Sequence, residues 1–365
     1  MTRPGRLGVG VVGTGRVGAV LGNALRGAGH PVVAASGISE GSRERAETLL
    51  PGVPLVEVPE VVRRAELVLL TVPDDALAGL VTGLGDLGAW QPGQIVVHTS
   101  GRFGTDVLAA ARAVGAIPLA IHPAMTFTGT SLDLSRLAGC PFAVTGPNAV
   151  LPIGQALVVE IGGEPVVVEE SARGLYHAAL AHGANHLVVL VAQAAQALAA
   201  AGVADPGRML GPLLEAALDG ALRAESPSDP SGDRGAGAIS ALTGPVRRGD
   251  DGTVREHVAV LGALGASTGA VDVLAGYRAL ARAATQRSLA AGLVPDAAAT
   301  RLLDALAEGD VPGDVPDVTS ATPAAAPGMT GDAGWLDQEG RPADDPSGGS
   351  EDGPTGPDRP QEDER

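Results

Sequence analysis

Residues 7–18 read LGVGVVGTGRVG, and this stretch decides the fold. The apolar run Leu7–Val12 leads into Gly13, Gly15 and Gly18, spaced as G-x-G-x-x-G, and an Ala/Leu-rich helical segment follows. At this spacing the first glycine permits a tight turn and the second leaves the main chain open to close approach. The third lets the helix pack against the strand. The stretch therefore predicts a strand, a glycine turn and a helix at the start of the domain.

The glycine turn is typical of a site for the pyrophosphate of a dinucleotide. The N-terminus of the following helix offers free amides and the positive end of the helix dipole to an anion. A glycine-rich turn without a ligand is the alternative interpretation. The expected cofactor contacts come from this turn, the end of the second strand and the loops after the next two strands. They are Gly13, Thr14, Gly15, Arg16, Val17, Gly18, Ser36, Arg43, Val72, Pro73, Thr99 and Ser100.

The second strand indicates which nicotinamide nucleotide binds. It ends at Ser36, where an Asp or Glu would bind the ribose hydroxyls of NAD. Arg43 and the nearby Arg45 supply guanidinium groups that suit a 2′-phosphate. NADP, as NADPH, is therefore the expected cofactor, and NAD is less favoured. The alternative is that both arginines are solvated helix residues, since two glutamates lie close by in the sequence.

The first 169 residues alternate short β-branched runs with Ala-rich helical segments. This pattern predicts an α/β domain with a mostly parallel, doubly wound sheet of the Rossmann type. Each β-branched run is read as one strand. The expected strands are Leu7–Val12, Val32–Ser36, Leu67–Val72, Ile95–His98, Ile117–Ile121, Phe142–Thr145 and a weaker one ending near Val166–Val168.

The pattern changes at about Glu170, after which no β-rich run appears. Residues 170–308 are predicted to form an all-helical substrate and dimerisation domain, interrupted at Ser226–Gly237. Residues 309–365 are predicted to be a disordered acidic tail, because they contain too few apolar residues to offset the entropy of ordering. The expected helices are Leu175–Ala200, Gly207–Arg223, Arg255–Ala266, Val271–Gly292 and Asp296–Glu308.

Charge and cysteine content narrow the possible partners. Residues 309–365 contain 14 acidic and 3 basic residues, so they carry −11 of the net −17. The mildly acidic remainder argues against nucleic acid or an anionic membrane surface as a partner. A single cysteine, Cys140, excludes an internal disulfide and is typical of a reducing compartment. No His, Cys or carboxylate spacing indicates a metal site.

The location predicted from these features is the cytoplasm. The apolar run Leu7–Gly13 lacks the length and the cleavage site of a secretory signal. The apolar stretch near Leu187–Ala201 is interrupted by Gln193 and Gln196, and we interpret it as too short and too polar to span a bilayer. All 25 basic residues are arginines, so no lysine can act as a catalytic acid, base or Schiff-base former.

Five motifs occur in order along the chain and together resemble a known family. They are TVPDDAL (71–77), HTSG (98–101), IHPAMTF (121–127), YHAALAHGANHLVVL (176–190) and ALTGPVRRGD (241–250). The set is similar to Rossmann-like oxidoreductases whose second half is the domain of unknown function 2520. These resemble ketopantoate reductases, pyrroline-5-carboxylate reductases and β-hydroxyacid dehydrogenases. The resemblance implies a nicotinamide-dependent reductase with a helical domain of the 6-phosphogluconate-dehydrogenase C-terminal type, and a homodimer by analogy.

The candidate catalytic residues stand on the first long helix. His177, Ala181 and Asn185 are four residues apart and share one face, whereas His182 and His186 share a neighbouring face. In ketopantoate reductases the comparable helix carries a lysine at the position of His177 and asparagines at the positions of Ala181 and Asn185. This chain therefore differs from that pattern at two of the three positions, His177 and Ala181. Histidine can still protonate a developing alkoxide, and Asn185 can orient the substrate.

The remaining substrate contacts are expected from loops. His122 follows the fifth strand and should approach the nicotinamide ring and the substrate. Thr243 and Arg248, in the ALTGPVRRGD motif, are expected to hold a substrate carboxylate. The alternatives are purely structural roles: Thr99 and Ser100 would cap a helix, and the Thr-Gly-Pro turn would only mark the N-terminus of a helix.

The sequence therefore predicts an NADPH-dependent reductase of a small 2-oxo acid, with ketopantoate as the first substrate to consider. Two other functions remain open. One is reduction of a cyclic imine, because pyrroline-5-carboxylate reductases carry a similar Thr-Gly-Pro turn. The other is a non-catalytic NADP-binding sensor or scaffold, which the missing lysine and the acidic tail would suit.

Overall fold

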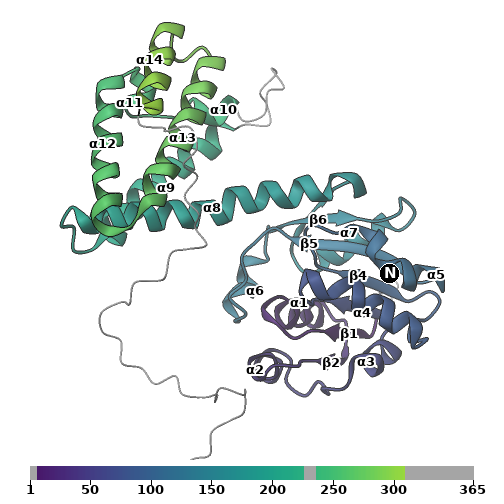
Figure 1. The fold of residues 1–365 in the computed structure, drawn as a ribbon. Helices are drawn as coiled ribbons and strands as arrows, with labels where there is room; N and C mark the ends of the chain where they lie inside the picture. The colour runs from purple at the N-terminus through teal and green to yellow at the C-terminus, as the bar shows by residue number, and fades with distance from the viewer. Residues whose placement is uncertain (1–5, 226–235, 309–365) are drawn as a thin grey trace, which may run out of the picture. The chain divides into compact units, whose positions relative to one another are not determined.

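The structure is a computed structural model that describes residues 6–225 and 236–308. The described residues up to Ala307 belong to one compact unit (Figure 1). The tail predicted from Gly309 lies outside the described residues, as does most of the predicted interruption at Ser226–Gly237. Within the described residues a β-sheet with flanking helices is followed by helices alone, as the sequence predicts.

Within the described part of the chain, seven strands form one sheet in the order β2-β1-β3-β4-β5-β6-β7. Neighbouring strands are parallel except β5 and β6, which are antiparallel. The chain leaves β1 toward β2 on one side and returns to β3 on the other, which places the switch point of the sheet beside β1. The strands are β1 Val9–Val12, β2 Val32–Ser36, β3 Leu67–Leu70, β4 Ile95–His98, β5 Ile117–Pro123, β6 Pro141–Thr145 and β7 Glu164–Val167.

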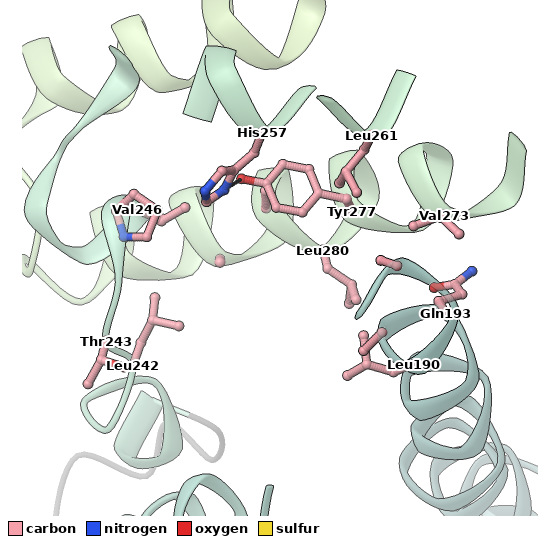
Figure 2. A pocket seen from close by; sticks show the side chains of 15 residues that line it. Leu190, Gln193, Leu242, Thr243, Val246, His257, Leu261, Val273, Tyr277 and Leu280 are labelled. Carbon is pink, nitrogen blue, oxygen red and sulfur yellow. Dashed lines mark hydrogen bonds between the residues drawn. The ribbon is translucent and has the colours of Figure 1, made fainter. Parts of the chain in front are cut away.

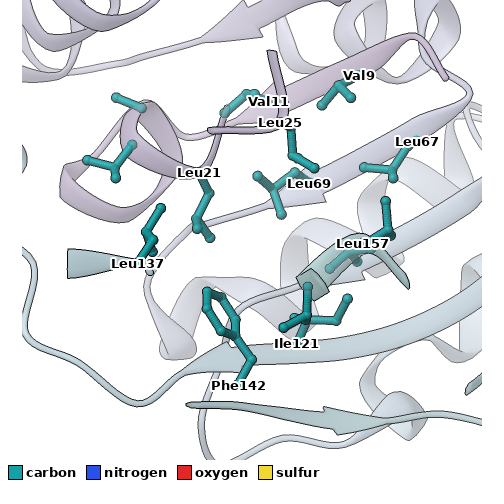
Figure 3. Packing of buried hydrophobic residues seen from close by; sticks show 14 of the residues in the cluster. Val9, Val11, Leu21, Leu25, Leu67, Leu69, Ile121, Leu137, Phe142 and Leu157 are labelled. Atoms are coloured by element: carbon teal, nitrogen blue, oxygen red, sulfur yellow. The ribbon is translucent and has the colours of Figure 1, made fainter. Parts of the chain in front are cut away.

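Helices cover both faces of the sheet, and each face has its own apolar core. Alternate residues of a strand point to opposite faces. Leu67 and Leu69 of β3 accordingly belong to the core shown in Figure 3, and Val68 and Leu70 to the core on the other face. The elements of this part are α1 Arg16–Gly27, α2 Glu40–Leu49, α3 Val58–Arg64, α4 Asp74–Asp86, η1 Thr105–Leu108, α5 Ala109–Ala113, α6 Leu132–Arg136, α7 Leu151–Glu160 and η2 Glu170–Ala172, where η marks a 3₁₀ helix.

From α8 onward the described residues are helical. A third apolar core joins α11 to α14 and contains Val254, Leu302 and Leu306, all fully buried. All five expected helices begin and end within four residues of the observed bounds. The helices are α8 Arg173–Ala200, α9 Pro206–Ala224, α10 Ala236–Ile239, α11 Pro245–Arg248, α12 Asp251–Thr268, α13 Val271–Ala290 and α14 Asp296–Ala307.

The helix α8 corrects one sequence expectation. It is long and apolar enough to cross a membrane by length and composition, so the stretch is not too short or too polar for that test. The two glutamines do not interrupt the helix, because glutamine is a good helix former. The core helix of a soluble protein passes the same test. Along α8, Leu175, Val188 and Val189 are exposed in the single chain.

Candidate active site at the carboxyl edge of the sheet

The turn between β1 and α1 has the shape that the glycine spacing predicts. Gly13 has a φ of +93°, which favours glycine. A Cβ on Gly18 would collide with the carbonyl oxygen of Gly13 and the hydroxyl of Thr71, whereas one on Gly15 would meet nothing within 4 Å. No side chain caps the N-terminus of α1. An open cradle in front of an uncapped helix N-terminus fits a pyrophosphate.

Two of the predicted cofactor residues shape this cradle. Ser36 is buried, and its hydroxyl accepts a hydrogen bond from the Gly13 amide at 3.3 Å. Thr14 is fully buried, and its hydroxyl donates to the carbonyl oxygen of Ser42 at 2.8 Å. The two hydroxyl groups therefore join the glycine turn to the β2–α2 turn. Direct contact of Ser36 or Thr14 with a cofactor stays a prediction.

The arginines near this turn are placed differently from one another. Arg43 is exposed and its Nε donates to the carbonyl oxygen of Gly37 at 3.3 Å. Arg45 and Arg16 both lie beside Gly129, since a Cβ there would be 3.1 Å from Arg45 Cδ and 2.9 Å from Arg16 Cγ. The Arg45 Nε is buried without a hydrogen-bond partner among the described residues. Arg45 is thus a further candidate for a 2′-phosphate, together with Arg16.

A buried carboxylate fixes the loop that carries Gly129. Asp133 accepts hydrogen bonds from the amides of Thr128 at 2.8 Å and Gly129 at 2.7 Å. Burial alone would raise the pKa of this carboxyl, but the amide donors outweigh it, and the pKa lies below its ordinary value. Asp133 is therefore ionised and holds the loop against Arg16.

The loops after β3 and β4 supply the other predicted cofactor residues. Val72 packs on an apolar core, and Pro73 stands at the start of α4. Thr99 lines a small apolar cavity next to the core in Figure 3. Ser100 is buried, and its hydroxyl accepts from the Phe103 amide at 3.3 Å. The helix that follows, η1, has Gly104 as its N-cap and no side-chain cap, so Ser100 does not cap it. These residues share the edge of the sheet with the glycine turn.

His98 ends β4 and has a structural role. Its Nε2 lies 2.8 Å from the carbonyl oxygen of Gly104, and its Nδ1 accepts from the Ser100 amide at 3.2 Å. Burial lowers the pKa of His98 to about 4, against the opposing effect of the bond to Gly104. The imidazole is therefore neutral at neutral pH, with its proton on Nε2.

One pocket brings together three of the predicted site residues. We call it the sheet-edge pocket; it has a volume of about 260 Å³. His122 reaches it from the end of β5, and His177 and Asn185 reach it from α8. Its lining is His122, Ala124, Met125, Thr126, His177, Leu180, Ala181, Ala184 and Asn185. The 177, 181 and 185 positions thus share one face of the helix, as their spacing predicts.

The neighbouring histidines lie outside that lining. His182 and His186 are exposed, and their Nδ1 atoms are 2.9 Å apart.

Within the pocket, burial and then the positive charge of Arg173 lower the pKa of His122 to about 4. His122 is therefore a neutral hydrogen-bonding group at neutral pH.

Thr243 and Arg248 are not brought to His177 within one chain. Thr243 lines a second pocket of about 390 Å³, which we call the bundle pocket; Figure 2 shows it beside His257 and Tyr277. Gln193 of α8 lines this pocket too, and 16 residues of helix separate it from His177, about 24 Å. Arg248 is exposed at the end of α11. Within one chain the predicted site is therefore divided: His177 and Asn185 line the sheet-edge pocket, Thr243 lines the bundle pocket, and Arg248 lines neither.

Sequence reasoning did not single out three residues that shape the sheet-edge pocket. Tyr176 bonds to His122 at 2.8 Å, and Arg173 is 1% exposed beneath it. A Cβ on Gly101 would lie 2.6 Å from His177 Cδ2 and 3.0 Å from His122 Nε2, so glycine permits their approach. The YH pair at 176–177 was a usable signal for Tyr176. Nothing in the local sequence distinguishes Arg173 from a solvated helix arginine.

Comparison with known proteins agrees with this architecture. A family model described as a Rossmann-like domain matches residues 1–123, and one described as a domain of unknown function (number 2520) matches residues 140–284. No curated protein matches the sequence. The second match begins inside the sheet rather than at the predicted boundary of 169/170, which stays a prediction.

Three solved structures have the same fold over nearly their whole length. A Bacteroides fragilis protein assigned as an NADP oxidoreductase is 20% identical, with a TM-score of 0.59, over 76% of this chain and 98% of that one. An imine reductase from Pseudomonas sp. is 18% identical, with a TM-score of 0.56, over 83% and 100%. An imine reductase from Myxococcus stipitatus in complex with NADP⁺ is 15% identical, with a TM-score of 0.51, over 81% and 99%.

At these identities the structural likeness shows the fold. The two family matches divide the chain as the structure does, into a sheet with a glycine turn and a helical second half. The resemblance read from the five motifs is thereby confirmed. The chain therefore combines a Rossmann-like domain over residues 1–123 with the domain of unknown function 2520 over residues 140–284.

Proposed function

We propose that the protein is an NADPH-dependent reductase of a small carbonyl compound, and that a 2-oxo acid such as ketopantoate is its substrate. The observation that carries the proposal is the convergence of His122, His177 and Asn185 on one pocket at the carboxyl edge of the sheet. In open α/β sheets this edge is where ligands bind. The glycine cradle after β1 lies at the same edge.

The cofactor assignment follows from the charges around the cradle. β2 ends at a serine, and no carboxylate takes the place where NAD would need one. Arg16 and Arg45 lie beside Gly129 near the turn, and Arg43 stands at the surface of α2. A guanidinium group pairs well with a phosphate. These residues support NADP over NAD.

The side chains of the pocket have distinct tasks. The reduced nicotinamide supplies the hydride to the carbonyl carbon. His177 donates a proton to the carbonyl oxygen as negative charge grows there, a role that accelerates such reactions about 10²–10⁴-fold. Asn185 donates a hydrogen bond that orients the substrate, and His122 lines the same pocket beside His177.

The proposal includes a homodimer in the cytoplasm. Leu175, Val188 and Val189 of α8 are 77%, 69% and 50% exposed in the single chain, and a second copy would cover them. Within one copy, neither Thr243 nor Arg248 lines the sheet-edge pocket that contains His177. A second copy would supply them, and Arg248 would hold the substrate carboxylate. Light scattering should give twice the monomer mass; a monomer at micromolar concentration would contradict this part.

The proposed activity is tested by turnover. Purified protein is mixed with NADPH and ketopantoate, and cofactor oxidation is followed by absorbance. We expect saturable oxidation with NADPH and a much weaker rate with NADH. Tight NADPH binding without turnover on a panel of 2-oxo acids and imines would contradict the proposal and favour the sensor or scaffold.

A cyclic-imine reductase is the second candidate, because the lining of the sheet-edge pocket contains no arginine. An imine lacking a carboxylate needs no cation to hold it. Parallel assays with 1-pyrroline-5-carboxylate and with an uncharged 1-pyrroline separate the two candidates. Turnover of the uncharged imine without turnover of any 2-oxo acid would replace the carbonyl substrate by an imine.

A further inference from the structure

The hydrogen bond between His122 and Tyr176 links the sheet to α8. The His122 Nδ1 and the Tyr176 hydroxyl are 2.8 Å apart, and the rings meet edge to face with centroids 5.6 Å apart. Tyr176 directly precedes His177, and the His177 ring lies 6.3 Å from that of His122. The three side chains therefore form one group at the entrance to the sheet-edge pocket.

A buried arginine fixes the tyrosine. Arg173 donates to the carbonyl oxygens of Ser100 at 2.6 Å, Phe103 at 2.9 Å and Ala143 at 3.4 Å. Its Cζ stands 5.7 Å from the centroid of the Tyr176 ring. Three backbone bonds hold the guanidinium in place, and the ring that rests on it has little freedom to move.

Burial and, after it, the same arginine keep the imidazole neutral. The charged and titratable groups that face His122 are Arg173, His177, His98 and Asp74. Burial and the first three lower the pKa of His122, and Asp74 alone opposes them. A neutral imidazole carries one N–H, so its position on the ring decides which nitrogen can donate.

The bond to the tyrosine allows two arrangements, with either the Tyr176 hydroxyl or the Nδ1–H of His122 as the donor. A hydroxyl that donates to Nδ1 leaves the ring proton on Nε2. Nε2 is the atom that approaches Gly101, 3.0 Å from where a Cβ would stand, and His177 lies at the same place. An N–H there faces the space beside His177 rather than the interior of the sheet.

We propose that Tyr176 is a positioning residue that holds His122 in its Nε2–H tautomer, so that His122 donates a hydrogen bond to the carbonyl oxygen of the substrate. This inference rests on the proposed function and adds a second donor to the site. His177 supplies the proton, and His122 stabilises the charge that grows on the same oxygen. Two donors on one oxygen make the site selective for a hydrogen-bond acceptor.

The first test reads the tautomer directly. The full chain is labelled with ¹⁵N-histidine, and the ring nitrogen shifts of wild type and Tyr176→Phe are compared at neutral pH. The phenylalanine keeps the ring over Arg173 and removes only the hydroxyl. We expect His122, assigned with His122→Gln, to be the Nε2–H tautomer in wild type and a mixture in the variant. An unchanged tautomer, or Nδ1–H in wild type, overturns the proposal.

The chain offers a matched control. Tyr277 bonds to the Nδ1 of His257 at 2.9 Å in the bundle pocket, with the same edge-to-face geometry. Tyr277→Phe should alter the signals of His257 and leave those of His122 unchanged. A change at His122 in this control would show a general disturbance and overturn the assignment to Tyr176.

The second test reads the reaction. Tyr176→Phe should lower kcat about 10-fold with little change in KM, since a misoriented donor weakens an interaction made mainly in the transition state. His122→Gln should keep more activity than His122→Asn, because the longer amide places its N–H near Nε2. Equal activities, or a normal kcat in Tyr176→Phe, would overturn the role at the substrate. If wild type reduces no substrate, the proposed function fails, and the tautomer measurement still decides whether Tyr176 positions His122.

Discussion

Each of the two pockets is lined by a histidine that bonds to a tyrosine, but the surroundings of the two pairs differ. His122 bonds to Tyr176 at 2.8 Å in the first, and His257 bonds to Tyr277 at 2.9 Å in the second. Burial raises the pKa of both tyrosines, but only Tyr176 has a buried arginine that opposes the rise. A histidine–tyrosine pair alone is therefore not a sign of an active site.

The difference lies in what the backbone places around each pair. The sheet-edge pair stands at the carboxyl end of a strand, near the glycine turn, with a guanidinium held by three carbonyl oxygens below it. The bundle pair lies among aliphatic side chains such as Leu190, Leu261 and Leu280 (Figure 2). We therefore assign the reaction to the sheet-edge pocket and a packing role to the bundle pocket. The predictions below test this assignment.

The largest effect should come from His177→Ala. Removal of the proposed proton donor should lower kcat at least about 100-fold, the lower end of the range for general acid catalysis. His186→Ala is the matched control, because His186 is exposed on the same helix and lies outside the lining of the pocket. Steady-state rates of NADPH oxidation provide the measurement. A kcat within threefold of wild type would remove His177 from the reaction.

Acid should destabilise the sheet through His98. The pKa of His98 falls from 6.5 to about 4 on folding, so between these values the unfolded chain binds a proton that the folded protein does not. The free energy of unfolding therefore falls as the pH drops through this window, by about 3 kcal/mol for a fully buried group.

The measurement is urea unfolding at pH 7 and pH 4.5. His98→Gln removes the titrating ring, and its free energy of unfolding should fall less between these two pH values than that of wild type. The exposed His186→Gln should retain the wild-type difference. If His98→Gln also retains it, another group is responsible for the loss of stability in acid.

Gly101→Ala should displace two side chains of the sheet-edge pocket without removing any polar group from it. The added Cβ would lie 2.6 Å from His177 Cδ2 and 3.0 Å from His122 Nε2, so both rings must shift. Displaced catalytic groups lose rate steeply, and we expect kcat to fall about 10-fold. Gly79→Ala on α4, where a Cβ meets nothing within 4 Å, should leave kcat unchanged. Equal rates for the two variants would show that the close approach of the two rings to Gly101 does not contribute to catalysis.

The sequence predicted the strands well because their side chains alternate between two buried faces. Leu67 to Leu70 of β3 are all buried, and short β-branched or apolar runs between turns are typical of the strands of a covered sheet. The helix face of His177 and Asn185 followed from the 3.6-residue period. These features depend on residues close together in the sequence.

The rest of the site depends on contacts between distant residues. Arg173 meets carbonyl oxygens 30 to 73 residues away, and no local pattern predicts such partners. Thr243 was expected to hold the substrate because a Thr-Gly-Pro turn exposes amides and a hydroxyl, but such a turn does not indicate which pocket it borders. The periodicity of the sequence predicts on which face of a helix or strand a side chain lies. The distant residues that pack against that face are known only from the fold.

The smallest effect should come from Tyr277→Phe in the bundle pocket. The hydroxyl bonds to His257 between α12 and α13, and its loss should lower the free energy of unfolding by about 1 kcal/mol. The apolar ring stays in place, so the packing of α13 is kept. Urea unfolding, with fluorescence and circular dichroism recorded together, gives the measurement. A loss above about 3 kcal/mol would show that the bundle pair belongs to a larger polar network, and the contrast between the two pockets would then be smaller than their linings indicate.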